Sequence, residues 1–143
     1  MDRHFSKFLE SNWQRHHIEC HYGWLPLIRE LHERMLELDP KYQIQQVKEK
    51  FGVLRFYFST QKKDSFAKMN ELVSEYESKS GHMCEWCGDP AETRTENGWM
   101  RTICDDCNEH VWSNRHDIKL WKEGEARLFQ KLLDKKIIDS VPE

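Results

Sequence analysis

The sequence predicts an α+β fold in which helices pack on a β-hairpin and a cysteine-rich module precedes a C-terminal helix. Several segments carry apolar residues every three or four positions, which is typical of helices, whereas residues 53–59 alternate as a strand does. At 143 residues the chain is about the size of one domain. We divide it into a helical and β-hairpin part, residues 1–81, and a cysteine-rich part with the C-terminal helix, residues 82–143. We expect one compact unit, because the break between them is too short for a linker.

Two helices are expected before the hairpin. The first covers residues 3–15, where apolar side chains recur at helical spacing: Phe5, Phe8, Leu9 and Trp13. The second ends at Asp39-Pro40, because the residue before a proline avoids the α region. Its apolar face consists of Leu27, Ile28, Leu31, Met35 and Leu38.

The hairpin is predicted over residues 43–49 and residues 53–59, with a turn at Phe51-Gly52. Alternation in the second strand places three apolar residues on the face that should meet the core: Leu54, Phe56 and Phe58. The opposite face then carries Val53, Arg55 and Tyr57. Alternation does not determine the register between the two strands, so it does not show which lysine lies beside Arg55.

Two further helices are expected after the hairpin. One starts at a cap provided by Asp64 or Ser65 and ends at Gly81, because glycine commonly terminates helices. Its core-facing residues are Phe66, Met69, Val73 and Tyr76. The other is a long C-terminal helix outlined by Leu120, Trp121, Leu128, Leu132 and Leu133.

The chain has no apolar leader and no run of about 20 apolar residues that could cross a membrane, so we expect a cytoplasmic protein with reduced thiols. Two Cys-x-x-Cys pairs, Cys84/Cys87 and Cys104/Cys107, are separated by sixteen residues. Such pairs suit a tetrahedral metal ion, because each short loop directs two thiolates inward. We predict one structural Zn²⁺ bound by these four cysteines, which leave no open position for water or substrate. A rubredoxin-like iron site would use the same ligands.

The segment between the pairs contains Asn97-Gly98, a strong signal for a two-residue hairpin turn. The second pair, Cys104/Cys107, begins a segment that we expect to be helical. A knuckle, a hairpin and a ligand pair at a helix start together form the arrangement of a treble-clef zinc site. The alternative is a zinc ribbon, in which a second knuckle replaces the helix.

The charge distribution argues against a general polyanion binder. The chain carries 22 basic and 25 acidic side chains, a net charge of −3. Residues 82–143 contain 9 basic and 13 acidic side chains, and four thiolates with one Zn²⁺ lower their net charge from −4 to −6. This part should repel phosphate backbones.

Two surfaces are candidates for binding a macromolecule. Residues 41–63 interleave basic and aromatic side chains, as nucleic-acid surfaces do, with the candidate contacts Lys48, Lys50, Arg55 and Tyr57. The solvated face of an ordinary hairpin carries the same residue types. The other surface belongs to the cysteine-rich part. Because tryptophan anchors protein interfaces, its candidate contacts with a partner protein are Trp86, Trp99 and Trp112.

Histidines suggest two further sites. His17, Cys20 and His21 are close enough in sequence to bind a second metal ion, although a half-exposed helix end has the same composition. His110 and His116 follow the second cysteine pair and raise the alternative of an HNH-type nuclease. That chemistry needs a histidine base from the hairpin before the helix, and residues 88–103 contain no histidine. We therefore predict a protein that is not an enzyme.

Four stretches together resemble a family of small, mostly uncharacterised phage and prophage proteins: GWLPLIRELHERM, IQQVKEKFGVLRFYF, HMCEWCGDP and GWMRTICDDC. They lie within residues 23–107 and occur in that order. The turn of the family reads Phe-Gly-Gly-Leu, and Val53 replaces its second glycine here, which leaves the turn type open. The resemblance implies a phage origin and a metal site at the four cysteines, but no activity and no catalytic residue.

Small phage proteins without catalytic constellations commonly bind a host component. We therefore expect a non-enzymatic protein that binds and inhibits or redirects a host protein in the host cytoplasm, in host takeover or anti-defence. A nucleic-acid-binding regulator is the alternative, and a nuclease comes third. The sequence identifies neither the target nor the oligomeric state.

Overall fold

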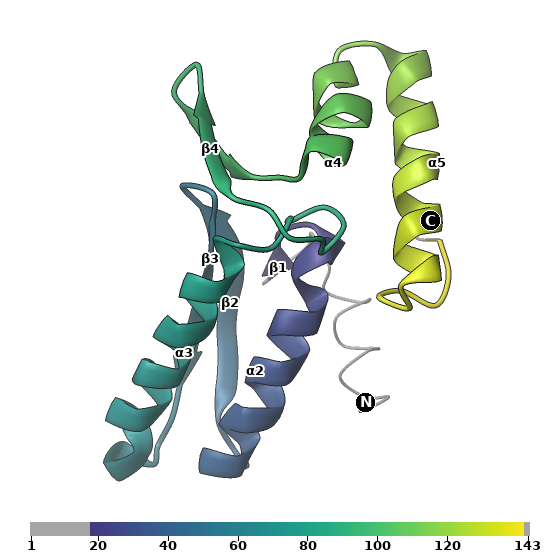
Figure 1. Cartoon of the computed structure of the whole chain (residues 1–143). Helices are drawn as coiled ribbons and strands as arrows, with labels where there is room; N and C mark the ends of the chain where they lie inside the picture. Colours follow the sequence, from purple (N-terminus) through teal and green to yellow (C-terminus); the bar gives the residue numbers. More distant parts are fainter. Residues whose placement is uncertain (1–17, 142–143) are drawn as a thin grey trace.

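The structure is a computed structural model, and it describes residues 18–141. The helix expected over residues 3–15 lies outside this range. Within the range, four α-helices and two small β-sheets confirm the α+β class (Figure 1). The larger sheet and two helices come from residues 18–80, whereas the smaller sheet and the other two helices come from residues 93–134.

The larger sheet of the described chain has the strand order β1-β2-β3. β2 (Gln43–Lys50) and β3 (Val53–Ser59) form the predicted antiparallel hairpin. At its turn, Phe51 and Gly52 have φ angles of 54° and 85°, which fit a type I′ turn. β1 (Ile18–Glu19) pairs with β2 in parallel, and a strand of two residues is too short to show alternation in the sequence.

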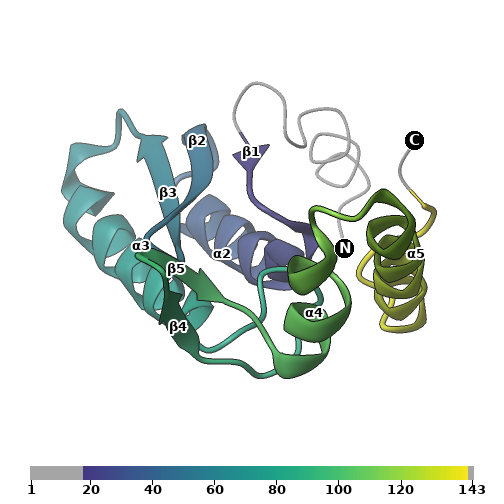
Figure 2. The ribbon, with the colours of Figure 1, turned by 90° about the horizontal axis from the view of Figure 1, so that it is seen from above.

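Two helices, α2 (Leu25–Leu38) and α3 (Phe66–Ser80), cover one face of this sheet (Figures 1 and 2). Their apolar residues share one core with the hairpin, as predicted: Leu31, Met35, Met69, Val73, Tyr76, Val47, Leu54 and Phe56. The prediction was wrong for Phe66, which is 50% exposed. Phe66 occupies the first position of α3, where its ring meets the half-buried Phe58 ring at 5.8 Å instead of the core.

Neither end of α3 has the capping structure that the sequence predicts. Asp64 and Ser65 belong to a short 3₁₀ turn that leads into the helix, and Ser65 makes no side-chain cap hydrogen bond. The helix ends at Ser80, as predicted, but Gly81 has a φ of −69°. The termination therefore does not use the left-handed conformation that makes glycine common at helix ends.

The side chains at the end of α3 bond to the outer edge of β3. Ser80 Oγ accepts a hydrogen bond from the Leu54 amide at 2.8 Å, and Glu77 Oε2 accepts one from the Phe56 amide at 2.9 Å. Arg55 also pairs with Glu77 at 3.9 Å. Because these amides would otherwise be free to pair with another strand, α3 closes this edge of the sheet.

The cysteine-rich part contains the second hairpin and two helices. β4 (Thr93–Glu96) and β5 (Trp99–Thr102) pair around Asn97-Gly98, whose φ angles of 53° and 83° confirm the predicted two-residue turn. α4 (Asp105–His110) and α5 (Ile118–Asp134) follow, and they lie beside each other in Figures 1 and 2.

The C-terminal helix α5 buries Leu128 and Leu132, as predicted, but Leu120 is 42% exposed. α5 crosses α4 at Gly124, where a Cβ would lie only 1.9 Å from the carbonyl oxygen of His110. Leu120 lies on the same face about one turn before this crossing, and its exposure shows that the covered length of the face ends before it. Trp121 and Leu133, which were also expected in the core, are half-buried.

Backbone contacts join the two parts of the described chain. The Gly23 amide donates a hydrogen bond to the Glu85 carbonyl oxygen at 2.8 Å. Thr102 Oγ1 donates one to the Gly52 carbonyl oxygen at 2.6 Å. A Cβ at Gly52 would lie 3.0 Å from a Thr93 methyl carbon, so the turn of the first hairpin is packed against the second hairpin.

These contacts predict different effects for the two turn glycines. A Cβ at Gly98 would meet nothing within 4 Å, so Gly98→Ala should lower the free energy of unfolding by about 1 kcal/mol, the strain of a left-handed alanine. Gly52→Ala should cost at least about 1 kcal/mol more, because it also crowds the second hairpin. Chemical denaturation of both variants measures the difference. Equal losses would show that the two hairpins do not depend on this close packing.

Candidate functional site

The four cysteines converge on one point. Their sulfur atoms all lie within 4.8 Å of one another, and Cys87 Sγ is 3.6 Å from Cys104 Sγ. Four thiolates around a tetrahedral metal ion with bonds of about 2.3 Å have sulfur atoms roughly 3.8 Å apart. Cys84, Cys87 and Cys107 are buried and Cys104 is half-buried. The four side chains could therefore hold one metal ion.

Two local structures position these side chains. Residues 84–89 form a tight knuckle in which the Gly88 amide donates to the Cys84 carbonyl oxygen at 2.9 Å. Gly88 has a φ of 84°, which only glycine adopts without strain. On the other side, Cys104 is the N-cap of α4, and its sulfur accepts a hydrogen bond from the Cys107 amide at 3.4 Å. This bond orients the second pair.

The knuckle rests on the backbone of residue 23. A Cβ at Gly23 would lie 2.4 Å from the Cys84 carbonyl oxygen and 2.7 Å from the Cys87 amide nitrogen. Trp24, which is fully buried, donates from Nε1 to the Met83 carbonyl oxygen at 2.8 Å. The start of α2 thus supports the first cysteine pair, although it is about 60 residues away in sequence.

Ionisation of the four thiols is coupled. Hydrogen bonds from Cys107, Cys84 and Cys87 hold the pKa of Cys104 far below its ordinary value. The pKa values of Cys87 and Cys107 are raised, chiefly because these thiols donate to Cys104. The pKa of Cys84 is also lowered, to about 7. The cluster therefore stabilises only some of the thiolates, and a cation has to compensate the charge before all four can ionise.

Basic side chains of α5 hold the outer side of the cluster. Lys135 Nζ donates to the Cys87 carbonyl oxygen at 2.9 Å and pairs with Asp89. Lys131 pairs with Asp89 at 2.6 Å and with Asp106 at 3.4 Å. Arg127 donates to Asp106 at 2.8 Å and lowers the pKa of that carboxyl. α5 therefore connects the knuckle to the first turn of α4.

The residues suggested for a second metal ion do not form a site within the described chain. His17 lies outside the described range. Cys20 is buried in the core, where burial raises the pKa of its thiol, and His21 stacks on Trp86 at 4.5 Å. Burial also lowers the pKa of His21 to about 4. Within residues 18–141, only the four-cysteine group has ligand atoms close enough to share an ion.

The three tryptophans suggested for partner binding line one cavity of about 560 Å³. Trp99 is 69% exposed, whereas Trp86 is only 5% exposed and packs edge-on against Trp112 at 6.1 Å. Further residues of the wall come from the segment before α2, the first hairpin turn, the knuckle and the second hairpin, and none was predicted at this surface: His21, Glu49, Lys50, Phe51, Glu85, Gly98, Met100 and Arg101. No pattern in the sequence connects these segments, because the knuckle and both hairpins meet only in the folded chain.

The basic hairpin residues are only partly brought together. Lys48 and Arg55 are cross-strand partners, and the Lys48 ammonium lies 5.8 Å from the centre of the Tyr57 ring. Arg55 forms an ion pair with Glu77 on α3, so part of the Arg55 charge is already compensated. Lys50 lies at the end of β2 and lines the tryptophan cavity.

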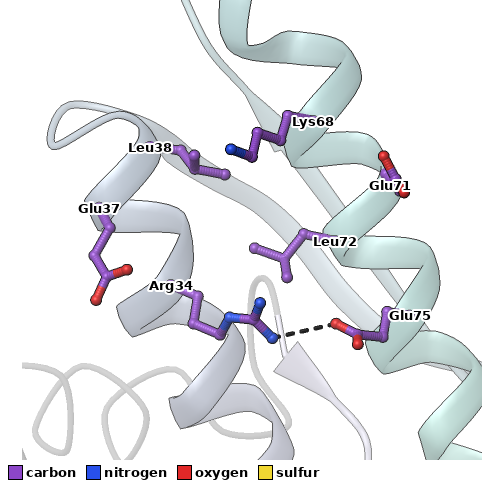
Figure 3. A pocket seen from close by; sticks show the side chains of 7 residues that line it. All are labelled: Arg34, Glu37, Leu38, Lys68, Glu71, Leu72 and Glu75. Atoms are coloured by element: carbon purple, nitrogen blue, oxygen red, sulfur yellow. Dashed lines mark hydrogen bonds and ion pairs between the residues drawn. The ribbon is translucent and has the colours of Figure 1, made fainter.

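A second cavity, of about 540 Å³, lies between α2 and α3 (Figure 3). Its wall carries charges of both signs and two leucines: Arg34, Glu37, Lys68, Glu71, Glu75, Leu38 and Leu72. Arg34 and Glu75 pair across it at 3.2 Å, as the dashed line in Figure 3 shows. It contains none of the catalytic, metal or partner-binding candidates that the sequence suggested.

None of the helices in residues 18–141 combines the length and the apolar character needed to span a bilayer.

The cluster geometry predicts that metal binding depends on the four clustered cysteines and not on Cys20. Cys104→Ser should reduce the bound metal from one ion per chain to less than about a tenth of that, because three thiolates bind much more weakly than four. Cys20→Ala is the matched control, since Cys20 is buried but lies outside the cluster, and it should retain the ion. Elemental analysis of both purified variants measures this. Retention of a full equivalent by Cys104→Ser would contradict the assignment.

Comparisons with known proteins found no relative of this chain. No protein-family model, curated protein or solved structure matches the chain. The assignment of a site therefore rests on the residues themselves, foremost the four converging cysteines, which form a candidate metal centre.

Proposed function

We propose that the metal is one structural Zn²⁺ in a treble-clef-like module. The order of elements supports this proposal: a knuckle with Cys84 and Cys87, the β4–β5 hairpin, and then Cys104 and Cys107 at the start of α4. Four cysteines complete a tetrahedral coordination sphere, so the ion would stabilise the fold and take no part in a reaction. Elemental analysis distinguishes zinc from iron, which the same ligands would bind.

The function that we propose is binding to another protein, without enzymatic activity. The observation that supports it is that Trp86, Trp99 and Trp112, each 13 residues from the next in the chain, share one cavity. Trp99 and Phe51 remain 69% and 64% exposed at this cavity. Exposed aromatic side chains around a hollow are typical of a protein interface, where they bury large apolar areas.

Only the sequence resemblance indicates what kind of protein the partner is. If the chain belongs to a phage, the partner is a host protein in the cytoplasm, which it would inhibit or redirect in host takeover or anti-defence. The acidic character of residues 82–143 favours a partner with a basic or neutral surface.

The second candidate function is nucleic-acid binding through the first hairpin. Lys48, Arg55 and Tyr57 lie together on the sheet face opposite α2 and α3, and Tyr57 is 43% exposed. This arrangement can contact a phosphate and stack on a base. Binding to phosphates should weaken steeply with salt, whereas an interface anchored by tryptophan should not.

Substitutions on each of the two surfaces distinguish these functions. Trp99→Ala should weaken capture of the partner protein at least about tenfold and leave the melting temperature nearly unchanged, because Trp99 is exposed at the tip of a hairpin. Charge reversal of Lys48 and Arg55 to Glu should leave capture unchanged. The measurement is a pull-down from nuclease-treated lysate of the host, followed by titration of the captured protein.

The opposite result would favour the other surface. If charge reversal abolishes function while Trp99→Ala does not, the basic hairpin is the binding face and the nucleic-acid function replaces the first proposal. Lys50 is not changed, because it lies at the end of β2 and also lines the tryptophan cavity.

A nuclease is the third function suggested by the sequence. His110 Nε2 lies 3.6 Å from Asp106 Oδ1, and Asp106 also pairs with Arg127 and Lys131 of α5. This histidine therefore contributes to the contact between α4 and α5. His110→Ala and His116→Ala should each retain binding to the partner within about twofold, since neither residue lines the tryptophan cavity. Metal-dependent cleavage of DNA or RNA that disappears in either variant would establish the nuclease instead.

A further inference from the structure

The tryptophan cavity combines aromatic side chains with carboxylates. Phe51, Trp86, Trp99 and Trp112 supply the aromatic surface. Glu49 and Glu85 line the same cavity, and they also line an adjoining hollow of about 360 Å³ beside Cys20. Carboxylates next to aromatic rings form the kind of wall that attracts a cation, through charge and through the negative ring faces.

Glu85 is the unusual member of this wall, because it is a carboxylate that is only 4% exposed. Its Oε2 accepts a hydrogen bond from the His21 amide at 3.0 Å. Among the ion pairs that residues 18–141 form with one another, none includes Glu85 or Glu49. Burial raises the pKa of Glu85 to about 8, so its carboxyl group serves this wall mainly in hydrogen bonding. The half-buried Glu49 is the carboxylate whose charge a ligand could compensate.

Two cations also belong to the wall, and each already has an aromatic partner. Arg101 is 5% exposed, pairs with Glu96 at 2.6 Å and stacks on the Trp112 ring at 4.2 Å. The Lys50 ammonium lies 5.7 Å from the centre of the Phe51 ring at the outer end of the turn. Arg101 shows within this chain how the wall binds a guanidinium, namely with an aromatic face on one side and a carboxylate on the other.

We propose that the cavity receives a lysine or arginine side chain of a partner protein, with its charge near Glu49 and Glu85 and its apolar stem against Trp99 and Phe51. This inference rests on the proposed function as a protein-binding surface and specifies the chemistry of its partner. A cationic side chain fits because long basic residues combine an apolar stem with a charged end, as this wall does. The net negative charge of residues 82–143 would also attract a basic segment.

The proposal can be tested with one side chain before any partner is known. N-acetyl-arginine methylamide is titrated into the full-length, metal-loaded protein, and binding is followed by the indole N–H signals in NMR spectra. The matched probe is N-acetyl-citrulline methylamide, which has nearly the same shape but no charge. We expect the arginine probe to shift the signals of Trp86 and Trp99 and to bind at least about tenfold more tightly than the citrulline probe. Equal binding, or preference for an N-acetyl-glutamate probe, would overturn the proposal.

Variants of the carboxylates locate the bound charge. Glu49→Gln and Glu85→Gln each retain an oxygen that can accept the hydrogen bonds from Gly52 and His21. Glu49→Gln should weaken binding of the arginine probe about tenfold, because the facing charge is lost, whereas Glu85→Gln should have a smaller effect, because burial raises the pKa of Glu85 to about 8. Glu123→Gln on the exposed side of α5 is the control and should change nothing. If Glu85→Gln unfolds the protein, as melting would show, Glu49→Gln decides alone.

The proposed cationic occupant and the proposed function can fail independently of each other. If Trp99→Ala abolishes capture of a partner but Glu49→Gln leaves both capture and the arginine probe unaffected, the protein interface stands and the cationic occupant is wrong. If the arginine probe binds with the expected charge dependence but no partner protein depends on Trp99, the cavity assignment stands and the proposed function fails.

Discussion

Four cysteine sulfurs within 4.8 Å of one another are the constraint on which the structure of residues 82–111 depends. Apart from the cysteines, the buried apolar residues of this segment are Trp86, Ile103 and Val111, which is too little apolar surface to hold two loops and a hairpin together. An ion bound by the four cysteines would link the knuckle to α4 and replace the missing core, because metal binding contributes directly to the free energy of folding. Every residue of the tryptophan cavity that comes from this segment depends on that link.

The first half of the described chain determines where this segment lies. Gly23 lets the backbone of the knuckle approach within contact distance of the backbone before α2, and Gly52 does the same between the two hairpin turns. Both contacts are closed by hydrogen bonds, to Glu85 and from Thr102. The cavity arises between these two contacts, so its shape depends on two glycines that line little or none of its wall.

The distribution of charge in the folded chain differs from what the net charge suggests. Two acidic residues near the cysteines, Asp89 and Asp106, are compensated locally, since they pair with Lys131 and Arg127 of α5 and with Lys135 at its C-cap. Glu49 and Glu85, which line the tryptophan cavity, have no such pair among the described residues. In the proposed cationic site, Glu49 would attract the cation next to the exposed tryptophan.

The sequence by itself determined the local structure: the first hairpin, whose second strand alternates, a hairpin at Asn97-Gly98, and two cysteine pairs whose spacing is typical of a metal site. These features depend on neighbouring residues, whose geometry is nearly independent of the rest of the chain. Tertiary structure decided the exposure of Phe66 and Leu120, because periodicity identifies the apolar face of a helix but not the length over which another element covers it. It also decided the register that places Lys48 beside Arg55, and it brought Glu49 and Glu85 to the tryptophans. Residues from the two hairpins and the knuckle meet there only because backbones packed at Gly23 and Gly52 bring distant segments together.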